Sequence, residues 1–125
     1  MSEARPIKVA IADGSPAFLT AAANYVASLP GFVLAGTANT ALQAMTLVTS
    51  AGPDILLLDL GRSPVRGLEM VKQVKAAPRA PAIVAMTLFH TPEAAAAASR
   101  AGADALVGKE SFVKGLSQAL ARLFP

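Results

Sequence analysis

Apolar and polar positions alternate along the chain in blocks: short aliphatic or β-branched runs are separated by longer segments with helical periodicity. Short runs of this kind are typical of strands, and apolar residues spaced three or four apart form one face of a helix. The runs that predict strands are residues 8–12, 32–36, 55–58, 82–87 and 104–107. The segments that predict helices are residues 16–29, 40–50, 68–76, 92–100 and 112–123. Strand and helix therefore alternate five times, which predicts an α/β fold.

Helix starts are marked by hydroxyl residues. Ser15-Pro16 and Thr91-Pro92 each place an N-cap residue before a proline that suits the first helical position. Ser111 predicts a similar cap for the last helix. The segment 61–67, rich in Gly, Ser and Pro, predicts a loop before the third helix.

The order of elements restricts the topology. Right-handed β-α-β crossovers require a parallel five-stranded sheet with helices on both faces. The four consecutive aliphatics at 55–58 predict a strand buried on both of its faces. The chain shows no internal repeat, linker or second domain, so residues 1–125 are predicted to form a single domain.

Composition narrows the functional classes. Hydrophobic residues make up 54% of the chain and charged residues 15%, which excludes a disordered protein. No apolar stretch is long enough to span a bilayer and no secretory signal precedes the first strand, so we expect a cytoplasmic protein with no membrane partner. The absence of cysteine excludes disulfides and thiolate metal sites. The net charge of +3 is spread over scattered bases, which favours a solvated basic surface over a DNA-binding patch.

Four chemically active side chains stand where predicted strands end. Asp13, Asp59, Thr87 and Lys109 follow or close the first, third, fourth and fifth strands. The carboxyl ends of parallel strands meet at one edge of the sheet, where open α/β folds place their sites. Carboxylates bind Mg²⁺, while hydroxyl and ammonium groups donate to phosphate oxygens. A carboxylate can itself act as the nucleophile and form an acyl phosphate.

The same residues belong to four ordered motifs. They are Ile11-Ala12-Asp13, the run 53–59 with Gly67 eight residues after Asp59, Met86-Thr87, and the run 102–109 that ends in Gly108-Lys109. In this order and spacing they resemble a response-regulator receiver domain of two-component signalling over the whole chain. The resemblance implies a flavodoxin-like (βα)5 doubly wound sheet with strand order 2-1-3-4-5.

The resemblance also implies roles for these residues. Asp59 matches the phosphoacceptor, which takes a phosphoryl group from the phosphohistidine of a sensor histidine kinase. Lys109 and Thr87 match the side chains that contact the transferred group. Asp13, Asp59 and the backbone carbonyl of Gly61 match the contacts to Mg²⁺. Such a domain transfers the group to itself and is not a turnover enzyme.

Several positions depart from the family pattern. Gly14 stands where the family usually has a second acid, and its loss is expected to weaken Mg²⁺ binding because affinity follows ligand charge. Arg62 replaces a frequent Met and brings a positive charge toward the depleted site. Leu88 replaces a small residue at the entrance, and Leu106 replaces the aromatic switch residue of many relatives.

Two readings of the site stay open. In the first, the domain is phosphorylated at Asp59 and switches its association with partners or with itself, as a homodimer through the fourth and fifth helices. In the second, it is a pseudo-receiver that binds proteins without phosphorylation: Asp59 is only an ion-pair partner of Lys109, and Asp13 is only a turn residue. DNA is a partner only through a helix-turn-helix output domain of a longer regulator, which these 125 residues do not contain.

A different class, a small flavodoxin-like enzyme or nucleotide binder, is disfavoured. It requires a phosphate-cradling Gly-x-Gly-x-x-Gly loop after the first strand, and residues 12–16 lack that pattern. The lone His90 has no cysteine or second histidine with which to bind a metal, so a solvated side chain is expected.

Overall fold

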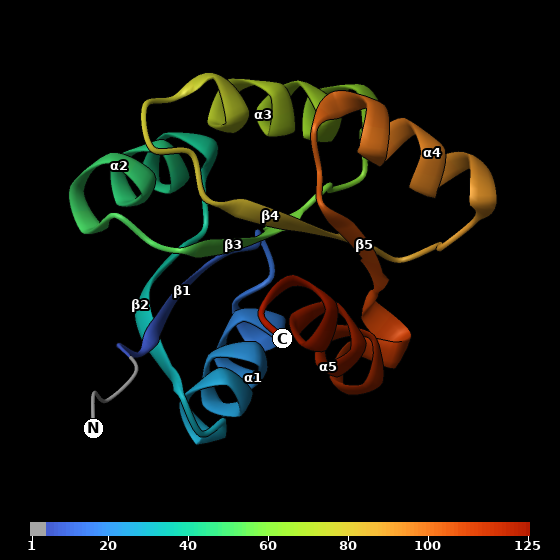
Figure 1. Cartoon of the computed structure of the whole chain (residues 1–125). Coiled ribbons are helices and arrows are strands. Elements are labelled where there is room, and N and C mark those ends of the chain that lie inside the picture. The colour runs from blue at the N-terminus through green and yellow to red at the C-terminus, as the bar shows by residue number, and fades with distance from the viewer. Residues whose placement is uncertain (1–4) are drawn as a thin grey trace.

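The computed structural model describes residues 5–125 and shows alternating strands and helices (Figure 1). The strands are β1 (Ile7–Ala12), β2 (Phe32–Ala38), β3 (Ile55–Asp59), β4 (Ala82–Thr87) and β5 (Ala105–Gly108). The helices are α1 (Pro16–Ser28), α2 (Ala41–Ala51), α3 (Pro64–Ala76), α4 (Pro92–Ala101) and α5 (Phe112–Leu123), with a short 3₁₀ turn, η1 (Lys109–Ser111), before α5.

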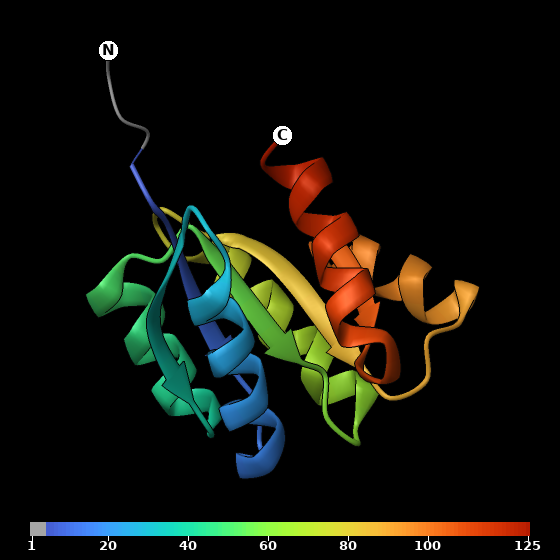
Figure 2. The same cartoon turned by 90° about the horizontal axis from the view of Figure 1, so that it is seen from below.

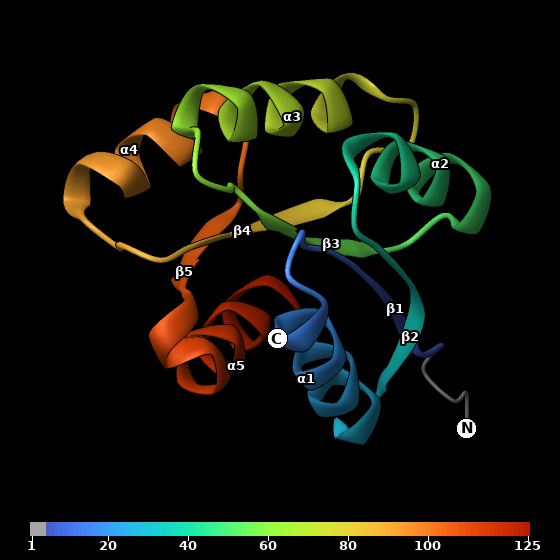
Figure 3. The same ribbon diagram turned by 180° about the vertical axis from the view of Figure 1, so that it is seen from behind.

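The strands form one parallel sheet in the order β2-β1-β3-β4-β5, which confirms the predicted fold class and strand order. Helices α1 and α5 cover one face, and α2, α3 and α4 cover the other (Figures 1 and 3). From β1 the chain adds β2 on one side of the sheet and then β3, β4 and β5 on the other, so the strand order reverses between β1 and β3. In open α/β sheets such a switch point opens a crevice at the carboxyl ends of the strands.

Strand β3 shows how the sequence builds both layers of the core. Successive side chains of a strand point to opposite faces, so Ile55 and Leu57 pack under α1 and α5 while Leu56 and Leu58 pack under α2 and α3. Ile55, Leu56 and Leu57 are fully buried. Burial on this scale contributes roughly 1.5–3 kcal/mol for each large aliphatic side chain. The predicted strand buried on both faces is confirmed.

The helix caps predicted at Ser15 and Thr91 are confirmed. The Ser15 hydroxyl accepts from Phe18 N–H at 3.3 Å, and the Thr91 hydroxyl accepts from Ala94 N–H at 3.0 Å. Each cap satisfies a backbone donor that has no partner within its own helix.

The predicted start of the third helix was wrong. Helix α3 begins at Pro64, so residues 64–67 are helical and the predicted loop is shorter than expected. The reason is local: Pro64 has its backbone fixed near helical geometry at the first position, and Ser63 takes the N-cap place without a side-chain capping hydrogen bond.

The junction between β5 and α5 also differs from the prediction. Strand β5 ends at Gly108, and Lys109–Ser111 form a 3₁₀ turn before the helix. The side chain of Ser111 makes no capping hydrogen bond, although this residue precedes the helix as predicted. Lys109 is therefore held in a tight turn rather than in an open loop.

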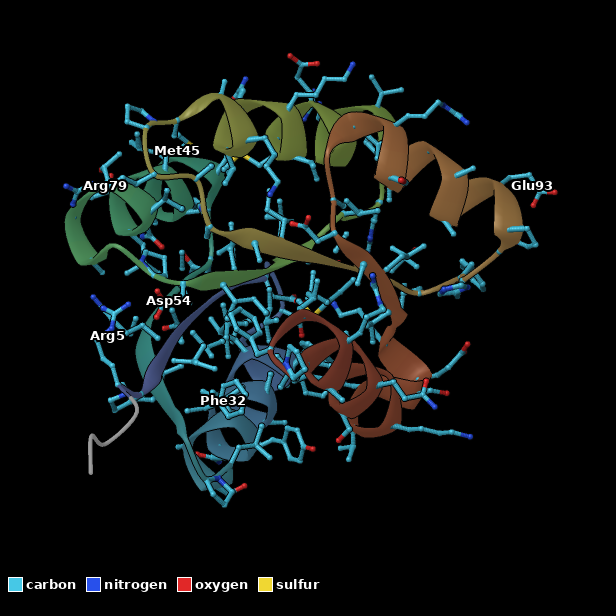
Figure 4. All side chains as sticks on the ribbon, in the orientation of Figure 1. Arg5, Phe32, Met45, Asp54, Arg79 and Glu93 are labelled. Carbon is cyan, nitrogen blue, oxygen red and sulfur yellow. The ribbon has the colours of Figure 1, made fainter. Side chains whose placement is uncertain are left out.

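The two ends of the sheet differ in what they carry. The C-terminus lies at the end opposite to the arrowheads of β3 and β4 (Figure 2). At the amino end of β3, Arg5 lies beside Asp54, with Nη2 3.3 Å from Oδ1 (Figure 4). None of the helices formed by residues 5–125 is long and apolar enough to cross a bilayer.

Candidate functional site

The site lies at the carboxyl ends of β1 and β3, the switch point of the sheet. Ala12 pairs with Leu58 in the register of these two strands, so Asp13 and Asp59 are neighbours. Asp13 continues the alternation of Val9 and Ile11, whose side chains belong to the core beneath α1 and α5. Asp59 follows Ile55 and Leu57 in the same way, so both carboxylates are carried toward that layer of the molecule.

Asp13 is the more buried of the two acids. Its Oδ1 accepts a hydrogen bond from Ser15 N–H at 2.8 Å, as a turn residue does. Its Oδ2 lies 2.7 Å from the Nζ of Lys109, and the side chain is 0% exposed. A buried carboxylate is costly without a compensating charge, so Lys109 stabilises Asp13 in this position.

Lys109 links the two acids. Its Nζ is 3.5 Å from Oδ1 of Asp59, farther than from Asp13. The Asp59 side chain is 18% exposed, so solvent reaches it where it does not reach Asp13. Two carboxylates and one ammonium group leave a single net negative charge at the strand ends.

A cavity of about 660 Å³ opens over these groups. Its lining residues are Asp13, Gly14, Ser15, Phe18, Asp59, Gly61, Arg62, Leu88 and Lys109. Arg62 therefore borders the same space as both acids, as its position after β3 suggested. Leu88 also borders this space but is 61% exposed, so it lies at the rim and leaves Asp59 open to solvent.

Thr87 stands at the same edge of the sheet but belongs to its other face. It continues the alternation of Ile83 and Ala85, which pack in the core beneath α2, α3 and α4. Its hydroxyl oxygen accepts a hydrogen bond from Phe89 N–H at 3.3 Å. Thr87 lines a neighbouring cavity of about 340 Å³ rather than the cavity over the acids. The structure thus brings Asp13, Asp59 and Lys109 together and leaves Thr87 beside them.

The donor atoms at the strand ends suit Mg²⁺ in kind. Carboxylate and carbonyl oxygens are its preferred ligands, and protein sites often supply only one or two carboxylates. Oδ2 of Asp13 is buried and receives no well-directed hydrogen bond, although Lys109 is close in charge contact. Gly61 has a left-handed backbone, with φ of +74°, just after Asp59. Within residues 5–125 no group of three or more His, Cys, Asp or Glu side chains could hold a metal ion. The residues present therefore fit a site with two carboxylates.

Replacing Gly14 by aspartate is expected to strengthen Mg²⁺ binding. A Cβ at this position would meet no atom within 4 Å, and Gly14 borders the cavity with both acids. We expect the Kd for Mg²⁺ to fall by about tenfold. The corresponding gain in binding free energy is a small part of the Coulomb energy between a carboxylate and a dication ~4 Å apart. Isothermal titration calorimetry on the two proteins measures the change.

Gly14→Asn is the matched control, because asparagine has the size of aspartate without its charge. We expect its affinity for Mg²⁺ to stay within about twofold of that of the unmodified protein. Equal affinities for the aspartate and asparagine variants would show that this position does not face the metal.

One residue at the site has no counterpart among the predicted site residues. The ring of Phe18 lies beneath the ammonium of Lys109, with Nζ 4.3 Å from the ring centroid. Helical periodicity predicted only that Phe18 belongs to the first helix. It lies three residues after the Ser15 cap, in the turn nearest to Asp13, but nothing in the sequence indicates its contact with Lys109.

Comparison with known proteins gives a consistent result. The sequence matches the family described as response regulator receiver domain over residues 9–121. It is 28% identical over 125 residues to the nitrate/nitrite response regulator protein NarL of Escherichia coli. It is 31% identical over 110 residues to a protein-glutamate methylesterase/protein-glutamine glutaminase of Myxococcus xanthus. These alignments cover 97% and 87% of the chain but only 58% and 32% of the two relatives.

Solved structures agree in fold. A two-component response regulator of the LuxR family from an Aurantimonas species superposes with a TM-score of 0.84 at 24% identity, covering 94% of this chain and 84% of that one. The isolated REC domain of RcsB from Salmonella enterica superposes with a TM-score of 0.83 at 21% identity, covering 94% of this chain and 86% of that one. At these identities the likeness concerns the fold alone.

Proposed function

The chain belongs to the response regulator receiver domain family of two-component signalling, and on that premise we propose that Asp59 accepts a phosphoryl group from the phosphohistidine of a sensor histidine kinase. The observation that carries the proposal is the difference between the two acids. Asp59 is 18% exposed and faces the cavity beside Lys109, whereas the Asp13 side chain is fully buried against the same lysine. A donor can approach only Asp59.

The proposed step is an in-line displacement. A carboxylate oxygen of Asp59 attacks phosphorus, the phosphorus–nitrogen bond of the phosphohistidine breaks, and the imidazole leaves and takes up a proton. Lys109 starts 3.5 Å from the attacking carboxylate and neutralises charge on the phosphoryl oxygens as the new bond forms. The Thr87 hydroxyl accepts from Phe89 N–H, and its own proton is the one that it would donate to those oxygens.

Mg²⁺ would be held by Asp13, Asp59 and the backbone carbonyl of Gly61. When bound, it supplies positive charge that offsets the charge of the phosphoryl group. Positive side chains also offset part of this charge, since Lys109 lies at both acids and Arg62 borders their cavity. We expect phosphoryl transfer that is slow at ordinary Mg²⁺ concentrations, because Gly14 supplies no carboxylate.

The consequence of phosphorylation is proposed to be altered association with a partner or with a second copy, through α4 and α5. A cavity of about 530 Å³ between β5 and α5, bordered by Leu106, Lys114 and Arg122, supports the part of this surface that α5 provides. A receiver of this family transfers the phosphoryl group to itself and does not turn over further substrate.

Incubation with acetyl phosphate and Mg²⁺, followed by intact-mass measurement, tests the proposal. Acetyl phosphate replaces the kinase as phosphoryl donor, and we expect the mass of one phosphoryl group to appear on each chain. A mass that does not change over a wide range of Mg²⁺ concentrations would favour the pseudo-receiver that associates without phosphorylation.

A further inference from the structure

The ammonium of Lys109 is held on three sides. Asp13 lies 2.7 Å from it, Asp59 lies 3.5 Å from it, and the ring centroid of Phe18 is 4.3 Å away. The lysine side chain is 12% exposed. A lysine side chain has four rotatable bonds and loses much rotational freedom when it is fixed, so contacts on several sides are needed to keep its tip in one place.

A ring face attracts a cation in a way that suits a mobile lysine. The attraction comes from the negative face of the π-system and operates within about 6 Å of the centroid. It grows when water is excluded, as it is at this partly buried ammonium. The ring offers no directional acceptor. It therefore keeps the ammonium near the acids without binding it as a third carboxylate would.

Phe18 is itself fixed by other aromatic rings. Its ring meets that of Phe112 edge to face, with centroids 5.2 Å apart and planes at 78°. Phe112 meets Tyr25 in the same manner, with centroids 5.9 Å apart. Phe112 begins α5 three residues after Lys109, so the stack ties helix α1 to the segment that carries the lysine.

We propose that Phe18 is a positioning residue that holds the Lys109 ammonium at Asp13 and Asp59, ready to move onto the phosphoryl group. The proposal rests on the proposed function in one respect, that Asp59 is the phosphoacceptor. Phe18 touches neither reacting atom and acts through Lys109. The electrostatic attraction of the ring, rather than its bulk, is the property that matters.

The first test needs no phosphorylation. The Nζ of Lys109 lies over the ring, so we expect the adjacent Cε protons to be shifted upfield by the ring current in the NMR spectrum of the unmodified protein. The signal that disappears in Lys109→Arg identifies this lysine. We expect the shift to be lost in Phe18→Leu, which keeps an apolar side chain, and kept in Phe18→Tyr, which keeps the ring. A Lys109 signal without an upfield shift in the unmodified protein would overturn the proposal, whatever becomes of the variants.

The second test measures the rate of phosphoryl acceptance from acetyl phosphate. We expect Phe18→Leu to lower this rate about tenfold and Phe18→Tyr to stay within about twofold of the unmodified protein, since only the tyrosine keeps the cation–π contact. Equal rates for the leucine and tyrosine variants, with thermal unfolding unchanged, would contradict the proposal. If the unmodified protein accepts no phosphoryl group, the proposed function fails, and the NMR test alone decides whether Phe18 positions the lysine.

Discussion

Replacing Asp59 by asparagine is expected to abolish phosphoryl acceptance from acetyl phosphate. The amide has nearly the shape of the carboxylate but no anionic oxygen to attack phosphorus. Asp13 cannot take its place, because its side chain is fully buried and its Oδ2 is paired with Lys109. We therefore expect no mass increase in the variant under conditions that fully modify the unmodified protein.

Asp54→Asn is the matched control for this substitution. Asp54 precedes the same strand at its opposite end, where its Oδ2 accepts from Lys8 N–H at 2.8 Å, a bond that an asparagine oxygen can also accept. We expect this variant to accept the phosphoryl group as the unmodified protein does. A full mass increase in Asp59→Asn would mean that another residue is the acceptor.

Replacing Gly67 by alanine is expected to destabilise the protein strongly. A Cβ at this position would lie 2.2 Å from the carbonyl oxygen of Leu60 and 2.7 Å from its Cα. These are backbone atoms of the residue that follows Asp59, so neither side can give way without moving the strand end or helix α3. We expect the free energy of unfolding to fall by roughly 2–3 kcal/mol, which lowers Tm by about 10 °C.

The helix propensities of alanine and glycine act in the opposite direction to this clash. Alanine is favoured over glycine in a helix by about 1 kcal/mol, so a net loss of stability reports the clash alone. Gly14→Ala serves as control because a Cβ there meets nothing within 4 Å, and its stability should stay within about 0.5 kcal/mol of the unmodified protein. Thermal and denaturant unfolding measure both variants. An unchanged stability in Gly67→Ala would contradict the close approach of α3 to Leu60.

Much of the site follows from the alternation of side chains along the strands. Asp13 and Asp59 share one face because each continues, in steps of two, a series of residues in the core beneath α1 and α5, and Lys109 reaches them from the 3₁₀ turn after β5. The same rule assigns Thr87 to the opposite face, after Ile83 and Ala85. The prediction considered only which residues follow the strand ends. It therefore placed Thr87 at the correct edge of the sheet but did not predict that Thr87 lies on the opposite face from the acids.

The boundaries that were predicted poorly had local causes. The start of α3 was missed because Gly, Ser and Pro between residues 61 and 67 are typical of a loop. Yet Ser63-Pro64 has the same pattern, a hydroxyl residue followed by proline, that correctly marked the starts of α1 and α4. The 3₁₀ turn at Lys109–Ser111 has no comparable signal, because its short length leaves no periodicity to detect.

Phe18 could not be assigned to the site from the sequence. Helical periodicity places an aromatic residue in the first turn of α1, but an inward-facing core position is the ordinary interpretation. Its contact with Lys109 depends on the 3₁₀ turn, which sets the backbone position from which the lysine side chain extends. The pairing thus joins residues 91 positions apart through geometry that exists only in the folded sheet.

The most direct test of the central claim is the chemical identification of the phosphorylated residue. Borohydride reduces an aspartyl phosphate to homoserine and leaves a free carboxylate unchanged, so the acceptor is read from the modified peptide by mass spectrometry. After incubation with acetyl phosphate and Mg²⁺, we expect homoserine at position 59 and unmodified aspartate at positions 13 and 54. Homoserine at another position, or at none after prolonged incubation, would contradict the assignment of Asp59 as the phosphoacceptor.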